Sequence, residues 1–125
     1  MGSGTGGGFS GGASLGANVA RLAGKYGFNQ QSGKFGVSGE GKSRVIVSDN
    51  PTATAQAFFK DLSAGGKVSN TGKGKVAIFS DKSSVFFRET SSSGGPAVNI
   101  KITGSQAQRY KIHFEPTGWI KGKDK

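Results

Sequence analysis

Two segments near the C-terminal end of the chain combine residue types that could act on a phosphate group. On either side of the loop SSSGGP in residues 85–103, and along residues 109–115, apolar residues recur at alternate positions, which is typical of half-buried β-strands. One face of these predicted strands carries Arg88, Lys111 and His113, the only histidine. An arginine fork matches two phosphate oxygens, and a histidine can transfer a proton near neutral pH. The combination predicts chemistry on a phosphodiester.

The overall charge agrees with a polyanionic partner. Seventeen Lys and Arg against seven Asp and Glu give a formal net charge of +10, and nucleic acid is the commonest partner of so basic a domain. The chain has no cysteine, which excludes disulfides and thiolate chemistry. A single histidine disfavours a histidine-based metal site. We therefore expect no cofactor and no histidine-bound metal, so that catalysis would be metal-independent or would use a carboxylate-bound Mg²⁺; of these two we predict the metal-independent one. No apolar run is long enough to span a membrane.

The composition divides the chain into three parts. Thirteen of the 23 glycines fall within the first 40 residues, which is typical of a flexible linker. We expect residues 1–42 to be a Gly-rich linker with a possible short helix at 14–27. Residues 43–116 would form the folded domain, and residues 117–125 a basic tail.

Within the folded part, the predicted elements are one clear helix and several strands. Asn50 and Pro51 are suited to a helix start, and the helix is expected over 52–64 with a buried stripe of Ala55, Phe58, Phe59 and Leu62. A short strand is expected over 44–49 and a loop over 67–75. The strands of the sheet are predicted at 75–81, 84–90, 97–103 and 109–115. These elements predict an α+β fold with one or two N-terminal helices packed on a twisted four-stranded antiparallel meander.

Alternation along each strand divides the predicted sheet into two faces. The helix-facing set is Val76, Ile78, Val85, Phe87, Val98, Ile100, Ile102, Tyr110, Ile112 and Phe114. The opposite set is Lys75, Phe79, Phe86, Arg88, Thr90, Asn99, Lys101, Arg109, Lys111 and His113. A face exposed only to water usually mixes both signs of charge. A cationic face without a carboxylate therefore favours polyanion binding.

Cleavage of RNA without a metal requires a proton-transfer group and cations that stabilise the phosphorane. Serine hydroxyls and glycine backbone N–H groups can also hold a phosphate, and aromatic rings can stack on bases. The candidate catalytic residues are Arg88, His113, Lys111, Ser91, Ser93, Thr90 and Lys60. The candidate RNA-binding residues are Lys75, Phe79, Phe86, Ser92, Lys101 and Arg109.

The order AFFKDLSAGGK, VFFRETSSSGGPAVNIKI and YKIHFE resembles the C-terminal ribonuclease domains of bacterial polymorphic toxins. More specifically, it is similar to the barnase–EndoU–colicin E5/D–RelE superfamily, which includes contact-dependent growth inhibition toxins. The resemblance covers residues 44–116. It implies helices packed on a four-stranded sheet with the active site on its open face. Arg88 and the hydroxyls of residues 90–93 match strand-end catalytic positions, Lys111 and His113 match the last strand, and Lys60 matches a helix lysine.

The same resemblance implies a biological setting. Several members of the superfamily cut tRNA without a metal, and each is neutralised by a dedicated immunity protein, which is often acidic. The domain would be secreted or delivered as the C-terminal part of a larger effector and would act in the cytoplasm of the target cell.

Two other functions fit the same residues. A non-catalytic nucleic-acid-binding module could use Phe79 and Phe86 as stacking platforms on a basic sheet. A structural fragment of a large secreted surface protein could use the glycine-rich segment as a stalk.

Overall fold

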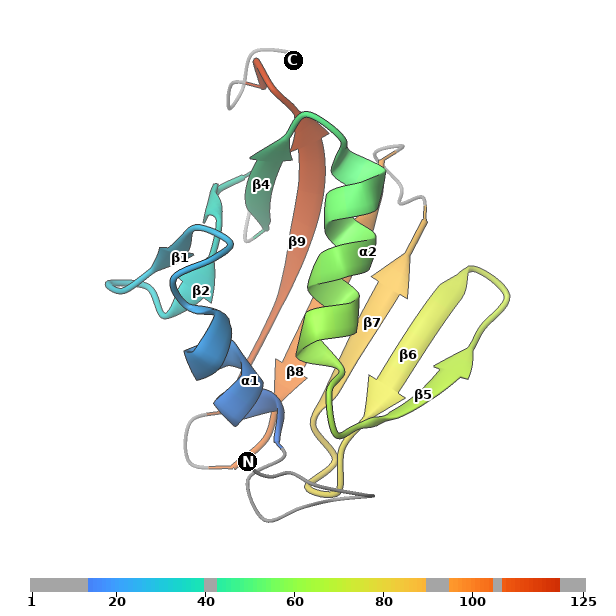
Figure 1. Ribbon diagram of the computed structural model, residues 1–125. Helices are drawn as coiled ribbons and strands as arrows, with labels where there is room; N and C mark the ends of the chain where they lie inside the picture. Colours follow the sequence, from blue (N-terminus) through green and yellow to red (C-terminus); the bar gives the residue numbers. More distant parts are fainter. Residues whose placement is uncertain (1–13, 40–42, 90–94, 105–106, 120–125) are drawn as a thin grey trace.

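The computed structural model describes residues 14–39, 43–89, 95–104 and 107–119, and Figure 1 shows the path of the chain. In these residues the chain forms two helices, α1 (Leu15–Leu22) and α2 (Pro51–Leu62). The strands are β1 (Phe28–Asn29), β2 (Lys34–Phe35), β3 (Val37–Ser38), β4 (Arg44–Ser48), β5 (Lys67–Asn70), β6 (Gly74–Ile78), β7 (Ser84–Arg88), β8 (Ala97–Ile102) and β9 (Gln108–Pro116). The α+β prediction is confirmed.

One sheet contains seven of these strands in the order β3-β4-β9-β8-β7-β6-β5, while β1 and β2 form a separate hairpin. Neighbours are antiparallel except β4 and β9, which run parallel. The four predicted strands are present as β6 to β9 and pair in sequence order. The prediction of a four-stranded sheet is nevertheless wrong, because β5 extends one edge and β4 and β3 extend the other.

Strand β5 lies in the segment expected to be a loop. All four of its residues, from Lys67 to Asn70, are exposed, so its sequence has no buried positions that would produce an apolar alternation. Its strand conformation comes from antiparallel pairing with β6. Sequence periodicity reports burial, and it therefore missed an exposed edge strand.

Both helices lie on the same face of the sheet, where α2 packs over the strands and α1 lies beside the C-terminal end of α2 (Figure 1). Helix α2 begins where the Asn50 side chain accepts a hydrogen bond from the backbone N–H of Ala53 at 3.2 Å, with Pro51 in the first turn. Its buried side chains are the predicted stripe of Ala55, Phe58, Phe59 and Leu62. Beyond the helix, Gly65 adopts a positive φ of 83°, a conformation that glycine adopts without strain.

Helix α1 is tied to the end of α2. The side-chain N–H₂ group of Asn18 donates to the carbonyl oxygens of Leu62 and Ala64, both at 2.8 Å. These bonds satisfy carbonyls that a helix end leaves without an intrahelical partner. Leu15, Val19 and Leu22 of α1 and Phe35 of β2 join the same hydrophobic core as α2 and the large sheet. Residues 15–35 therefore pack with residues 43–116.

A second tie between these regions is centred on Asp61 near the end of α2. The Tyr26 hydroxyl donates to Asp61 Oδ2 at 2.8 Å, and Lys25 Nζ lies 3.3 Å from the same oxygen. The hydrogen bond from Tyr26 lowers the pKa of Asp61. Burial, together with the hydrogen bond to Asp61, raises the pKa of Tyr26 to about 12.

The face of the sheet away from α1 and α2 is called the open face. Strand pairing places three rows of side chains on it, each running across β7, β8 and β9. The rows are Arg88–Ala97–His113, Phe86–Asn99–Lys111 and Ser84–Lys101–Arg109.

Candidate functional site

The first row of the open face brings together two of the predicted catalytic residues. Arg88 pairs with Ala97, and Ala97 pairs with His113. Two strand spacings of ~4.8 Å separate the Arg88 and His113 backbones by about 10 Å. Ala97, which is only 1% exposed, lies between them. Two long side chains therefore flank a short one, and their functional groups can approach the same ligand.

Arg88 is held in place by stacking on its own strand. Its guanidinium carbon lies 5.2 Å from the centroid of the Phe86 ring, a cation–π geometry. Among the buried side-chain nitrogens and oxygens of the described residues, Arg88 Nε has no hydrogen-bond partner. A buried N–H without an acceptor is costly and rare. This donor is therefore a candidate for binding an oxygen of a ligand.

His113 lies at the other end of the row from Arg88 and is half-buried. Burial lowers its pKa below the ordinary value of 6.5, and the positive charge of Lys111 lowers it further. The imidazole is therefore neutral at pH 7, the protonation state that a general base requires. A neutral histidine is a weaker candidate for the general acid.

The second row places Asn99 at the centre of the site. Asn99 pairs with Phe86 on one side and Lys111 on the other, and it is half-buried. Its amide can both donate and accept hydrogen bonds, as a base-reading residue does. Sequence reasoning placed Asn99 on this face but did not select it, because a single amide in a strand gives no signal without its neighbours. Lys101 and Arg109 pair in the third row, both exposed, as predicted.

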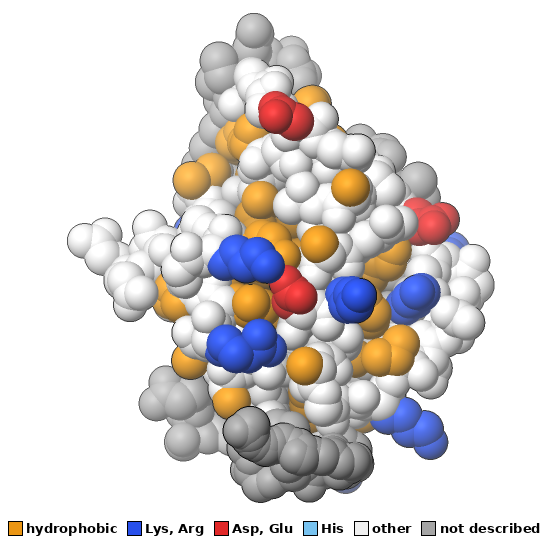
Figure 2. All heavy atoms as spheres, in the orientation of Figure 1, with side chains coloured by type: hydrophobic (Ala, Val, Ile, Leu, Met, Phe, Trp, Pro, Cys, Tyr) orange, Lys and Arg blue, Asp and Glu red, His pale blue; other side chains and the backbone are white. Residues whose placement is uncertain are grey.

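The charge on the open face is less one-sided than predicted. Along the described strands, pairing places five cations there, Lys67, Arg88, Lys101, Arg109 and Lys111, and one carboxylate, Glu115. Glu115 continues the alternation of Arg109, Lys111 and His113, and it pairs with Val47 of β4. The prediction of a carboxylate-free face is therefore wrong, although a strong excess of positive charge remains. On the opposite side of the molecule, basic and acidic side chains lie intermixed over the helices (Figure 2).

Three predicted site residues do not belong to the open face. Lys75 pairs with Phe87 and points to the helix-covered side, and Phe79 is only 3% exposed in the core. Their places on the open face are taken by Val76 and Ile78, which pair with Phe86 and Ser84.

Lys60 also lies away from the open face, because α2 packs on the other side of the sheet. It lines a cleft there together with Lys75. Strand β6 has apolar residues at both alternating positions, so periodicity did not determine which set is buried. The predicted placement of Lys75 and Phe79 on the open face is wrong. Lys60, a predicted catalytic residue, lies on the other side of the sheet from Arg88 and His113.

The remaining predicted residues, Thr90, Ser91, Ser92 and Ser93, lie outside the residues that the structure describes. Their predicted role in binding a phosphate follows only from their place in the sequence, two to five residues after Arg88. Glu89, which follows Arg88, lies on the helix-covered side, where it lines the same cleft as Lys75.

The described residues contain no group of three or more His, Asp or Glu side chains that could hold a metal ion. In the same part of the chain, neither helix has the length and apolar character needed to cross a membrane. Comparison with known proteins yields no match to a protein-family model, a curated protein or a solved structure. The site must therefore be interpreted from its own geometry.

Proposed function

We propose that this chain is the ribonuclease domain of a bacterial toxin and that it cleaves RNA on the open face without a metal. One observation supports this function above the others. In the row Arg88–Ala97–His113, a guanidinium, whose fork matches two phosphate oxygens, and a neutral imidazole flank one small residue. Lys111 lies beside the imidazole, in the next row on the same face.

These groups fit the reaction by which RNA cleaves itself when a base removes the 2′-OH proton. The 2′-oxygen attacks the adjacent phosphorus, the bond to the 5′-oxygen breaks, and a 2′,3′-cyclic phosphate forms. Neutral His113 would take the proton from the 2′-OH. Arg88 and Lys111 would stabilise the extra negative charge of the phosphorane. The 5′-oxygen needs a proton as it leaves, which water or the imidazolium formed in the first step can supply.

The choice of substrate and partners rests on the family resemblance. The proposed substrate is tRNA, and the proposed partner is an acidic immunity protein whose charge would complement the five cations of the open face. The proposed route is delivery as the C-terminal part of a larger effector into the cytoplasm of the target cell.

The test is cleavage of total RNA in the presence of EDTA by the wild-type chain and by Arg88→Ala and His113→Ala variants. We expect discrete tRNA fragments with 2′,3′-cyclic phosphate ends from the wild type and none from either variant. Lys67→Ala, which removes a cation from the edge strand of the same face, serves as the matched control and should retain activity. Wild-type activity that disappears with EDTA would exclude the metal-independent mechanism.

A second candidate function is RNA binding without cleavage. The half-buried Phe86 on the open face, covered in part by the Arg88 guanidinium, favours it because ring and guanidinium together form a stacking surface. Tight RNA binding by the wild type with no detectable cleavage at any pH would support this function over the first.

A further inference from the structure

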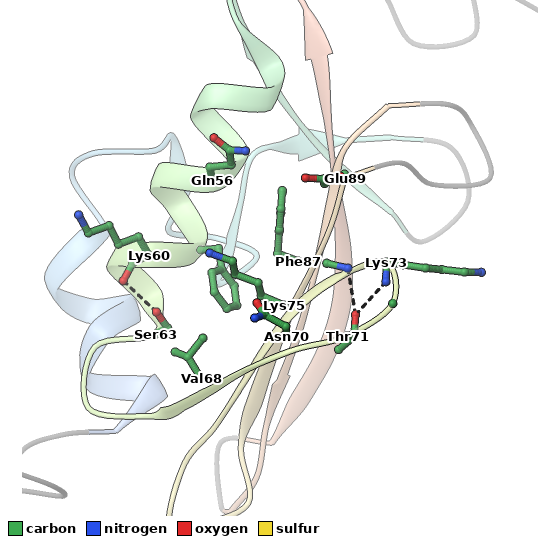
Figure 3. Close-up of a pocket in the computed structure, with 13 residues that line it drawn as sticks. Gln56, Lys60, Ser63, Val68, Asn70, Thr71, Lys73, Lys75, Phe87 and Glu89 are labelled. Carbon is green, nitrogen blue, oxygen red and sulfur yellow. Dashed lines mark hydrogen bonds between the residues drawn. The ribbon is translucent and has the colours of Figure 1, made fainter.

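The helix-covered side of the sheet contains a cleft that the open-face site does not use. It lies between the second half of α2 and the β5–β6 hairpin, and its volume is about 720 Å³. Figure 3 shows the side chains that line it. Strands β5 and β6 extend past α2 (Figure 1), so the helix leaves part of their inner face uncovered.

One wall of the cleft is apolar. Phe59 of α2 and Phe87 of β7 form its base, with ring centroids 6.0 Å apart. Val68 of β5 forms its outer side and is 48% exposed. Exposed aliphatic surface beside two aromatic rings favours a ligand with a flat apolar body.

The rest of the cleft lining is polar and includes three lysines, Lys60, Lys73 and Lys75, and one carboxylate, Glu89. Lys75 reaches from β6 toward α2, and Glu89 points inward from the end of β7, across from Gln56 (Figure 3). Asn70 pairs with Lys75 on the adjacent strand. Lys75 and Glu89 form no ion pair within 4.0 Å, since the ion pair found among the described residues joins Lys25 and Asp61. Both side chains line the cleft.

Close backbone contacts fix the position of the turn at residues 71–74, which lines the cleft next to Glu89. A Cβ on Gly74 would lie 1.9 Å from the carbonyl oxygen of Phe87, so only glycine fits there. The Glu89 N–H donates to the carbonyl of Lys73 at 3.3 Å, and the Thr71 hydroxyl accepts from the N–H groups of Lys73 and Gly74 at 3.1 and 2.9 Å. The turn is thus held against β7.

From these features we infer that the cleft is a nucleotide-binding site. The base would lie against Val68 and the two phenylalanines, and Lys75 would bind a phosphate. Glu89 would accept hydrogen bonds from an exocyclic amine of the base, as carboxylates do with cytosine. An acidic peptide fits less well, because it has no flat ring to lie against Val68, Phe59 and Phe87.

The position of the cleft connects it to the open face. Glu89 directly follows Arg88, and adjacent residues of a strand point to opposite faces. An RNA strand that passes over the turn at residues 71–74 could therefore contact Arg88 on one face and place a base in the cleft on the other. The identity of the ligand as RNA rests on the proposed function, whereas binding of a free nucleotide does not.

The test is an NMR titration of the full chain with AMP, CMP, GMP and UMP, and of its His113→Ala variant with a short single-stranded RNA. We expect amide shift changes at residues 56–63 and 68–75. Lys75→Met should weaken binding about tenfold, as expected for loss of a charge-assisted hydrogen bond. Glu89→Gln should weaken binding of CMP more than that of UMP. Lys67→Met, in the same hairpin but on the opposite face, should leave the affinities for CMP and UMP unchanged.

The arms of the experiment separate the possible failures. RNA binding in the cleft without binding of free nucleotides would identify RNA as the source of the ligand. Shift changes confined to the open face, or shifts of the cleft by oligoglutamate and not by nucleotides, would overturn the inference. RNA cleavage by the wild type with an unaltered nucleotide affinity in Lys75→Met would refute the cleft site and leave the proposed function standing. Nucleotide binding in the cleft without any RNA cleavage would refute the proposed function and leave the cleft site standing.

Discussion

Replacing Arg88 with methionine should stabilise the fold while abolishing RNA cleavage. Methionine keeps most of the apolar stem but removes the charge and the buried Nε donor, which has no partner. Leaving such a donor unsatisfied costs ~1–3 kcal/mol. The stacking of the guanidinium on Phe86 at 5.2 Å returns about 0.5–1 kcal/mol. The difference predicts that the variant is more stable by about 1 kcal/mol.

The measurement is urea unfolding of both proteins at pH 7, paired with the RNA cleavage assay. An increase in the midpoint with an unchanged slope reports a change in stability alone. Phe86→Leu is the matched control: it removes the ring under Arg88 and keeps the donor buried, so it should destabilise the fold. If Arg88→Met instead lowers the free energy of unfolding by more than ~1 kcal/mol, Arg88 is a structural residue. The assignment of its Nε to a ligand would then be wrong.

Four further predictions concern ionisation and packing. The NMR titration of His113, the single histidine, should have its midpoint below pH 6.5. Lys111→Gln should raise this midpoint, and an unchanged midpoint would show that the charge of Lys111 does not lower the pKa of His113. Because the folded pKa of His113 is below the unfolded value, stability should be full above pH 6.5 and decrease as the pH falls through the folded pKa, as acid unfolding curves can measure. Burial raises the pKa of both tyrosines to about 12. Their contribution to stability should therefore be full below pH 10 and be lost as the pH rises toward 12. Tyrosinate absorbance that appears near pH 10 in the folded protein would refute this prediction. Gly74→Ala should destabilise the hairpin by ~1–3 kcal/mol in urea unfolding, whereas Gly72→Ala, where a Cβ meets nothing within 4 Å, should have little effect.

The sequence was most informative where the determining interactions are local. Helix α2 was predicted within two residues of its observed bounds, since its cap at Asn50 and its stripe of Ala55, Phe58, Phe59 and Leu62 lie within one segment. The strands β7, β8 and β9 were also predicted with the correct faces, because one alternating set in each is predominantly apolar and the other contains the charged residues. The Arg88–His113 row followed from those faces.

The predictions failed where contacts between segments distant in sequence determine the structure. In β6, Val76 and Ile78 compete with Ala77 and Phe79 for the core, and the choice is made by α2 and by Gly66, whose Cβ would lie 3.0 Å from the Phe79 ring. Parallel pairing of β4 with β9 joins segments more than 60 residues apart, which no local pattern reports. The same misassignment of faces concealed the cleft that contains Lys75.

The place of β9 in the sheet has a consequence for how the chain folds. Although β9 is the last in sequence of the described strands, it lies between β4 and β8, so the two halves of the sheet are joined only when residues 108–116 have been made. Pairing over such sequence distances slows folding. Until then, β4 and β8 each present an unpaired edge, which is a site of aggregation. A ribosome-bound chain should therefore stay protease-sensitive until its final strand has emerged, and the protein should acquire its structure in one late step.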